Sequence, residues 1–153
     1  MGNGDGIMKR IMLVMAVVCC MLGLGSSAAY AKYTWVISSD TIGYYVDYDS
    51  KTYFNGHLFY WEKRKYEDDK VRQDYINGLN GLTGKDCSQF YYSIEKTESY
   101  YSTGSLHLRI IYTLFYDYDD NLVYSLDHKF DWKVMPPDTF GKIVDDRVRA
   151  YKK

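Results

Sequence analysis

The chain has 153 residues, and its basic and acidic side chains nearly balance, for a formal net charge of −1. A near-neutral mixture gives no electrostatic footprint for nucleic acid or an acidic membrane surface, so we expect neither as a partner. The aromatic content is unusual, with 18 tyrosines, three tryptophans and six phenylalanines. Aromatic side chains fit a pleated, half-buried surface, and the composition therefore favours a sheet-rich domain.

The first 31 residues have the pattern of a secretory signal peptide. Lys9 and Arg10 form a positively charged n-region, and residues 11–24 are apolar apart from glycine. The small-residue pattern of a signal peptidase site ends at Ala31. We predict cleavage between Ala31 and Lys32, which makes this an exported protein of the periplasm, the cell surface or the medium. The apolar run, about 14 residues, is shorter than the roughly 20 of a membrane-spanning helix, so we expect a chain that is not membrane-spanning.

Residues 32–153 are enough for one domain with its own core. They hold 17 basic and 19 acidic side chains, because Lys9, Arg10 and Asp5 belong to the leader, and their net charge is near −2. Their single cysteine, Cys87, cannot form an internal disulfide. We interpret it as a free, buried thiol; an intermolecular disulfide and a catalytic thiol are the alternatives.

Alternating apolar and polar residues predict three strands after the leader. They cover residues 33–38, 42–47 and 57–65. Residues 47–50, Asp-Tyr-Asp-Ser, predict a turn after the second strand, because Asp and Ser side chains bond nearby backbone amides. In the third strand we assign Phe59 and its alternate neighbours to the core, which leaves Tyr60 and Glu62 on the outer face.

The pattern changes to a helical period after the third strand. Acidic residues at 67–69 precede apolar residues at helical spacing, and carboxylates favour a helix N-terminus, so we predict a short helix over residues 67–77. We interpret the glycine-rich segment that follows, residues 77–84, as a loop.

Three further strands joined by short turns form a predicted meander. They cover residues 89–101, 105–117 and 122–131. The middle strand is long and has strand neighbours on both sides in sequence, so we place it at the centre of an antiparallel sheet. Its even-numbered residues from 106 to 116 are apolar or aromatic, which predicts that they share one face along the whole strand.

The end of the chain predicts an amphipathic helix after Pro136-Pro137. Its apolar face consists of Phe140, Ile143, Val144, Val148 and Tyr151. A single amphipathic helix after a run of strands buries that face on the sheet. The sequence therefore predicts an α+β fold: a mainly antiparallel sheet of about six strands, a C-terminal helix packed on it, and a short helix after the third strand.

Five short motifs occur in order along the chain: Trp35-Val36-Ile37, Tyr44-Tyr45-Val46-Asp47, Phe59-Tyr60-Trp61-Glu62-Lys63, Asp86-Cys87, and Trp132 before Pro136. In their order and spacing, residues 32–153 resemble the surface-adhesin protein E family of bacterial exported domains. The resemblance implies a mainly antiparallel sheet with a terminal helix. The best-known member type is an adhesin that binds host matrix proteins and can dimerise.

The resemblance also implies a difference at the end of the chain. In many members a cysteine at the position of Cys87 pairs with one near the end of the terminal helix. This chain ends Ala150-Tyr151-Lys152-Lys153 and lacks that second cysteine. We therefore expect its terminal helix to dock by packing alone.

Two classes of function follow from these patterns. The first is a non-catalytic, adhesin-like module that contacts protein partners at the cell envelope or a host surface through exposed tyrosines, which give large contact area at small entropic cost. The candidate partner contacts are Tyr45, Tyr60, Tyr91 and Tyr101. The alternative is that a curved sheet buries aromatic side chains on both of its faces, one under the helix and one in a dimer.

The second class is a periplasmic small-ligand carrier or an enzyme with a pocket on the sheet. His57, His107 and His128 lie on three predicted strands, with Glu62 or Asp127 as an acid to assist them. The sequence contains no HExxH or other close ligand spacing. We therefore predict no catalytic residue, no metal and no cofactor, and we favour the first class.

Overall fold

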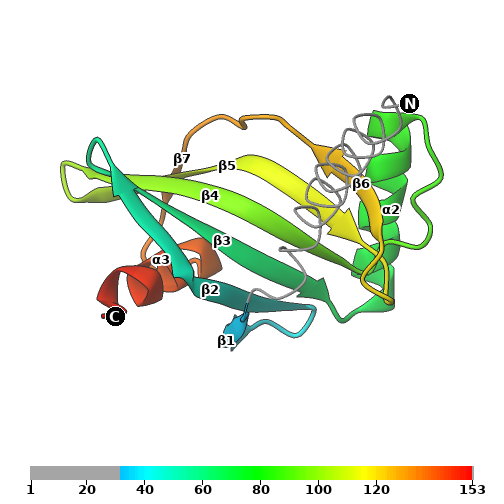
Figure 1. The fold of residues 1–153 in the computed structure, drawn as a ribbon, viewed down its shortest axis with the longest axis horizontal. Helices are drawn as coiled ribbons and strands as arrows, with labels where there is room; N and C mark the ends of the chain where they lie inside the picture. The colour runs from blue at the N-terminus through cyan, green and yellow to red at the C-terminus, as the bar shows by residue number, and fades with distance from the viewer. Residues whose placement is uncertain (1–31, 153) are drawn as a thin grey trace, which may run out of the picture. The chain divides into compact units, whose positions relative to one another are not determined.

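The structure is a computed structural model that describes residues 32–152; the predicted signal peptide and Ala31 lie outside the described residues. A seven-stranded antiparallel sheet and two helices make up the described chain (Figure 1). Their bounds are β1 Thr34–Ser38, β2 Ile42–Phe54, β3 His57–Tyr66, α2 Asp69–Thr83, β4 Tyr92–Ser102, β5 Ser105–Tyr116, β6 Leu122–Leu126, β7 Lys133–Met135 and α3 Phe140–Ala150. The predicted α+β fold, with its C-terminal helix and its helix after the third strand, is confirmed.

Strands β1 to β6 follow one another across the sheet in chain order, and β7 pairs with β5 beside β6. Two-residue turns close the two long hairpins: Asn55-Gly56 joins β2 to β3, and Thr103-Gly104 joins β4 to β5. All four of these residues have positive φ. Such turns match the twist of the flanking strands, and glycine adopts them without strain.

The long strand β5 changes face part-way along its length. Ile111 is left out of the register between β4 and β5. Leu106 and Leu108 consequently face the same side as Thr113 and Phe115. The prediction that the even-numbered residues share one face is wrong beyond this bulge, because an extra residue turns over every side chain after it. The strand also lies between β4 and the edge strands β6 and β7, so its predicted place at the centre of the sheet is wrong.

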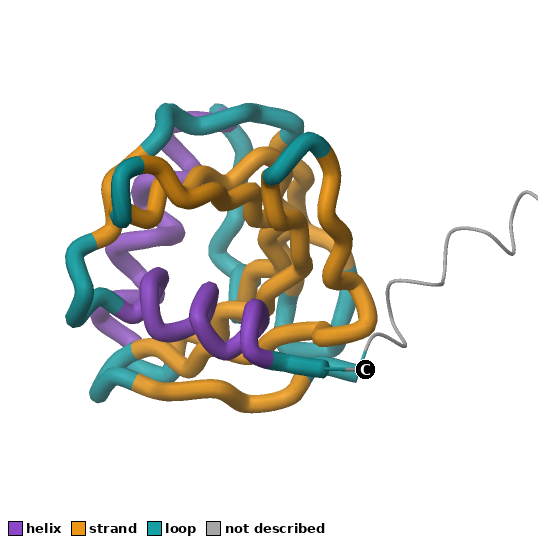
Figure 2. The backbone as a smooth tube through the Cα atoms, turned by 90° about the vertical axis from the view of Figure 1, so that its left-hand side faces the viewer, coloured by secondary structure: helices purple, strands orange, loops and turns teal. Residues whose placement is uncertain are grey.

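Both helices lie on the same face of the sheet, towards opposite ends, and the sheet curls around that face (Figures 1 and 2). We call it the concave face. One core cluster lies at α2 and consists of Tyr66, Ile76, Leu79, Cys87, Phe90 and Phe115. The other lies at α3 and consists of Val46, Leu58, Tyr60, Val144 and Val148. Between the clusters, the concave face carries buried polar side chains.

Strand β3 buries the opposite face from the one predicted. Tyr60 is 1% exposed and Glu62 is 2% exposed, whereas Phe59 is only half-buried on the other face. The prediction of Tyr60 as an outward-facing residue is wrong. The pattern misled because Glu62 is buried together with Arg64, which supplies its counter-charge.

Helix α2 continues through the glycine-rich segment predicted as a loop. Asp68 caps its first turn, and Gly84 ends it in the left-handed conformation with φ 66°. Leu79 is buried against the sheet. This packing offsets the low helix propensity of Gly78 and Gly81.

Two strands end elsewhere than predicted. β2 runs on through residues 47–50, where the predicted turn is instead an interruption of its register with β3. Ser50 Oγ donates to the carbonyl of Asp47 at 2.6 Å and accepts from the amide of Trp61 at 2.8 Å, so it satisfies backbone groups that the ladder leaves free. β6 ends at Leu126, because the bulge in β5 disrupts the edge that a longer strand would follow.

Helix α3 is held by more than apolar packing. The buried carboxylate of Asp145 accepts from Ser99 Oγ and, at 2.6 Å, from Arg149 Nε. Arg149 Nη2 also donates to Ser99 Oγ at 2.8 Å. Lys51 Nζ on β2 donates to the carbonyl of Arg149 at 3.1 Å. The expectation of docking by packing alone is therefore wrong, because a buried polar network ties the helix to β4.

Candidate functional site

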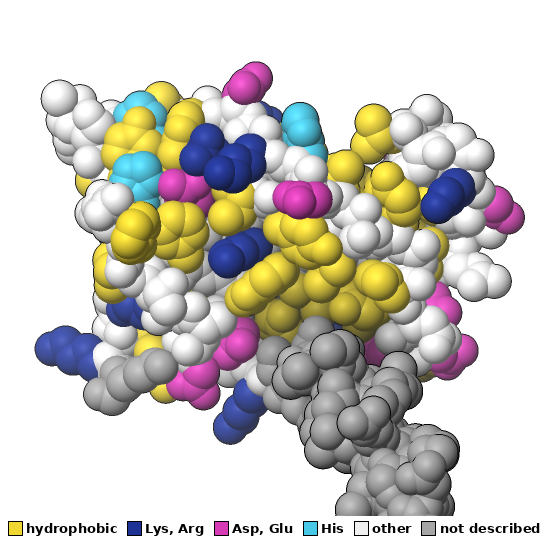
Figure 3. Space-filling model, turned by 45° about the horizontal axis from the view of Figure 1, so that its top comes forward, with side chains coloured by type: hydrophobic (Ala, Val, Ile, Leu, Met, Phe, Trp, Pro, Cys, Tyr) yellow, Lys and Arg dark blue, Asp and Glu magenta, His cyan; other side chains and the backbone are white. Residues whose placement is uncertain are grey.

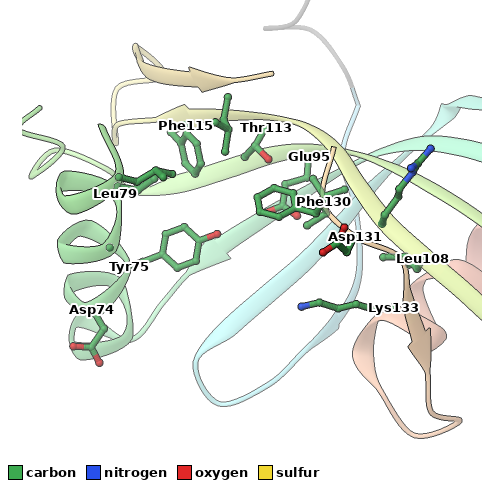
Figure 4. A pocket seen from close by; sticks show the side chains of 15 residues that line it. Asp74, Tyr75, Leu79, Glu95, Leu108, Thr113, Phe115, Phe130, Asp131 and Lys133 are labelled. Carbon is green, nitrogen blue, oxygen red and sulfur yellow. The ribbon is translucent and has the colours of Figure 1, made fainter. Parts of the chain in front are cut away.

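A pocket opens on the concave face beside α2 (Figure 4). Its volume is about 390 Å³, within the range of small-molecule sites. Its lining residues come from α2, β4, β5, β6, β7 and the segment between β6 and β7, and they include Tyr75, Leu79, Leu82, Glu95, Phe115 and Phe130. Most of these side chains are apolar, and the pocket is therefore suited to an apolar molecule.

The wall formed by α2 follows from helical spacing. Tyr75, Leu79 and Leu82 recur at four and three residues, so they share one side of the helix. Leu82 is 66% exposed, which is unusual for a large apolar side chain. Gly78 lies among them, and a Cβ placed there would meet no atom within 4 Å. The missing side chain leaves open space in the wall.

Glu95 on β4 forms the polar floor of the pocket and is 1% exposed. Its Oε1 accepts from Ser93 Oγ at 3.0 Å. Its Oε2 lies 3.1 Å from Arg64 Nη2 but accepts no hydrogen bond from any described residue. Arg64 directs its Nε and Nη2 groups at Glu62 Oε1 instead. Two buried carboxylates thus share one guanidinium.

The surroundings of Glu95 make its ionisation less favourable than that of an exposed carboxyl group. Burial raises the pKa of its carboxyl group against the opposing effect of Arg64, and the Glu62 charge adds to the rise. The pKa of the Tyr75 hydroxyl is also raised, first by burial and then by the Glu95 charge. Figure 4 shows Tyr75 pointing across the pocket towards Glu95.

The charges at the mouth of the pocket nearly cancel. Asp74 pairs with a lysine one turn earlier on α2, with 3.5 Å between Nζ and Oδ2. Arg109 pairs with Glu98 through two contacts of 2.7 Å. Asp131 and Lys133 have opposite charges and also line the pocket. When Glu62 and Glu95 are both ionised, the excess negative charge therefore lies at the floor.

The four tyrosines predicted as partner contacts do not form one surface. Tyr60 lies in the core under α3, so it cannot contact a partner. Tyr101 is 43% exposed, and its hydroxyl donates to Asp146 on α3 at 2.9 Å. Tyr45 and Tyr91 lie together in a second cleft. Only two of the four are thus brought to one place.

The second cleft lies on the other face of the sheet and has a volume of about 320 Å³. Its lining includes Tyr33, Tyr45, Lys63, Tyr91, Tyr92 and Tyr118. Lys63 Nζ lies 3.7 Å from the centre of the Tyr92 ring, and the Tyr92 hydroxyl donates to Asp120 at 2.8 Å. Because Lys63, Tyr92 and Asp120 already bind one another, the cleft is better suited to contact with the flat surface of another protein than to enclosing a small ligand.

The three histidines do not converge on one site. His57 and His107 each stack on Tyr100 with ring centres 4.8 Å apart, whereas His128 packs against Phe130. Figure 3 shows two histidines close together and the third apart from them. His57 Nδ1 lies 2.7 Å from Glu98, whose pKa is lowered because His57 and Arg109 together outweigh the effect of burial. These contacts describe a packed ion-pair cluster.

The acids considered as helpers lie away from the histidine pair. Glu62 projects from the opposite face of β3 to His57, and Asp127 is exposed after the end of β6. Within residues 32–152, no group of three or more His, Cys, Asp and Glu side chains is arranged to hold a metal ion.

Cys87 lies in the core cluster at α2 as a free thiol, 1% exposed. Its Sγ is 3.8 Å from Thr83 Oγ1. This environment is that of a small apolar side chain, and a bridge to a second chain would require the core to open.

Sequence reasoning missed the pocket beside α2. It placed Leu79 and Leu82 in a loop and gave Glu95 no role. One usable pattern was present: helical spacing continues from Tyr75 through Leu79 to Leu82 despite the glycines. A second usable pattern was the position of Glu95 directly after Ile94 inside an aromatic-rich strand, because a charged residue in such a strand is unusual.

Comparisons of the chain with protein-family models, with curated proteins and with solved structures found no match. The resemblance to the surface-adhesin protein E family therefore stays a prediction from motifs. Among the described residues, neither helix has the length and apolar character needed to cross a membrane. The two clefts are consequently the features of the described chain that point to a function.

Proposed function

We propose that residues 32–153 form an exported, non-catalytic binding domain that holds a small and largely apolar molecule in the pocket beside α2. The observation that supports this most strongly is a pocket of about 390 Å³ with apolar walls and one buried acid, Glu95, at its floor. Binding sites for small molecules are mostly apolar and carry a few polar groups that orient the ligand.

The polar groups of the floor are arranged for orientation rather than for chemistry. A nucleophilic site places a nucleophile within hydrogen-bond reach of a base. Glu95 is instead held by Ser93 and faces Arg64, which is engaged by Glu62. A fixed carboxylate of this kind selects and aligns a ligand.

Export is consistent with carriage of such a ligand. The predicted signal peptide would deliver the domain to an aqueous compartment. A mostly apolar molecule leaves water readily, and burial in the pocket would keep it dispersed there.

Binding of N-phenyl-1-naphthylamine, whose fluorescence rises in apolar surroundings, tests the proposal. The test variants are Gly78→Leu and, as a matched control, Gly81→Leu. Both glycines lie in α2, and a Cβ at either position would meet no atom within 4 Å, but only Gly78 belongs to the pocket lining. Leucine is a good helix former, so both variants keep α2.

We expect saturable probe binding by the unmodified domain and by Gly81→Leu. Filling the pocket in Gly78→Leu should weaken binding about tenfold or more, equivalent to about 1.4 kcal/mol. Absence of saturable binding, or equal affinities for the two variants, would contradict the proposal.

A protein-contact surface at the second cleft is the other candidate function, favoured by the meeting of Tyr45 and Tyr91 there. The purified domain would then bind a basement-membrane extract. The double variant Tyr45→Ala and Tyr91→Ala should lose that binding, while Tyr101→Ala should retain it, because Tyr101 packs on α3. Equal retention by all three proteins would exclude this surface. Use of the same face in a homodimer would show as a doubled mass in native mass spectrometry.

A further inference from the structure

The charge of the pocket floor indicates the chemical class of the ligand. We propose that the pocket takes a molecule with one protonated amine on an apolar body, with the ammonium group seated at Oε2 of Glu95. This inference rests on the proposed small-molecule function and specifies what that function recognises.

The first support is a buried acceptor whose ion-pair partner, Arg64, lies 3.1 Å away but gives it no hydrogen bond. Glu95 Oε2 is buried, belongs to a residue that lines the pocket, and accepts no hydrogen bond from the described residues. A buried acceptor that receives no hydrogen bond destabilises the empty pocket, and a donor on a ligand would remove that penalty. An ammonium group carries three donors and no acceptor, so it can satisfy Oε2 without leaving a new acceptor unpaired.

The second support is the charge balance of the floor. Glu62 and Glu95 carry two carboxyl groups, and Arg64 supplies one positive charge. One ammonium group would bring this buried cluster to neutrality when both acids are ionised. A ligand carboxylate would instead add a further negative charge beside the two acids. The charges at the mouth of the pocket nearly cancel, so they do not offset this preference for a cation over an anion.

The third support is the shape of the surroundings. Leu79 and Phe115 supply apolar surface for the body of the ligand. Tyr75 points its hydroxyl towards Glu95 from α2 (Figure 4), and a hydroxyl oxygen can accept a hydrogen bond from an ammonium group seated there. The apolar body and the charged head are thus recognised by different parts of the pocket.

The ionisation of Glu95 gives this recognition a pH dependence. The groups that face Glu95 are Glu62, Arg64 and Tyr66 on β3, Ser93 on β4, Tyr44 on β2 and Tyr75 on α2. Because burial raises the pKa of Glu95, affinity for an amine should rise with pH as the carboxyl group ionises. It should fall again near pH 10, where an alkylamine loses its proton.

A series of ligands with one chain length separates the head group from the body. We would measure how 1-octylamine, 1-octanol and octanoate displace N-phenyl-1-naphthylamine from the unmodified domain and from Glu95→Gln. Octylamine should bind about tenfold more tightly than octanol at pH 8, and octanoate more weakly than either. In Glu95→Gln the advantage of the amine should disappear while octanol binding remains.

Each other outcome has a distinct meaning. If octanol binds as tightly as octylamine, the inference fails and the proposed function stands. If the advantage of the amine persists in Glu95→Gln, Glu95 is not its cause and the inference fails. If neither the probe nor any member of the series binds, the proposed function fails as well. The pH profile of the unmodified domain provides a second test that does not depend on the folding of a variant. An affinity for octylamine that nowhere rises with pH between about 4 and 10, the ordinary pKa values of a glutamate and an alkylamine, would contradict the inference.

Discussion

Replacement of Asp145 by alanine should destabilise the domain strongly. Asp145 is 0% exposed and accepts hydrogen bonds from Ser99 and Arg149. Its removal leaves a buried hydroxyl without its acceptor and a guanidinium without its counter-charge. Breaking a buried charge pair in this way costs about 3–5 kcal/mol. Because the Arg149 side chain is 23% exposed, water recovers part of that loss, and we expect about 3 kcal/mol.

Urea unfolding followed by tryptophan fluorescence and circular dichroism would measure this loss. The matched control is Asp146→Ala, one residue further along the same helix. Asp146 is 49% exposed and pairs with Lys142, so its removal should cost less than about 1 kcal/mol. Equal destabilisation by the two variants would refute the reasoning, because α3 would then be held by its apolar side chains alone.

Three further predictions concern stability. Because burial raises the pKa of Glu95, the free energy of unfolding should fall as pH rises from about 4 through that raised pKa. Glu95→Gln should remove this pH dependence from urea midpoints measured between about pH 4 and 8. An unchanged pH dependence would exclude Glu95 as its source. Tyr60→Phe should raise the free energy of unfolding by up to about 1 kcal/mol, because the buried Tyr60 hydroxyl has no hydrogen-bond partner among the described residues; a clear loss would reveal a partner. Gly56→Val should lower the free energy of unfolding by about 1–2 kcal/mol in the same assay, because Gly56 has φ 79°. Gly78→Ala, inside a helix, should instead raise it by about 0.5–1 kcal/mol. Equal effects of the two substitutions would contradict the turn assignment.

Local alternation and turn residues were sufficient to predict the fold class. The pairs Asn55-Gly56 and Thr103-Gly104 have the residue types of tight turns, and the strands around them pair as hairpins. The terminal helix was recognisable because Val144 and Val148 recur at helical spacing and both are fully buried.

The errors came from interactions between residues far apart in the chain. The core face of β3 was misassigned because a charged Glu62 is normally exposed, and only its contact with Arg64 makes burial tolerable. The bulge at Ile111 depends on how β5 meets β4, which no local pattern reports. The end of α2 was misplaced because glycines usually stop a helix, whereas burial of Leu79 sustains this one.

The candidate site was harder to predict than the fold. The pocket exists only because α2, β4 and the segment after β6 meet on the concave face. The exposed tyrosines were a poor guide, since Tyr60 is in the core and Tyr101 is bound to α3. Composition identified the abundant aromatic residues but not the single acid, Glu95, on which recognition is proposed to depend.

Native mass spectrometry of the chain purified from an exporting host tests the central claim most directly. We predict a reproducible extra mass on the unmodified protein and on Gly81→Leu that is lost on denaturation, belongs to a small amine, and is missing from Gly78→Leu. A bare polypeptide mass for all three proteins, or an adduct that Gly78→Leu retains in full, would contradict the claim that the pocket beside α2 holds a ligand.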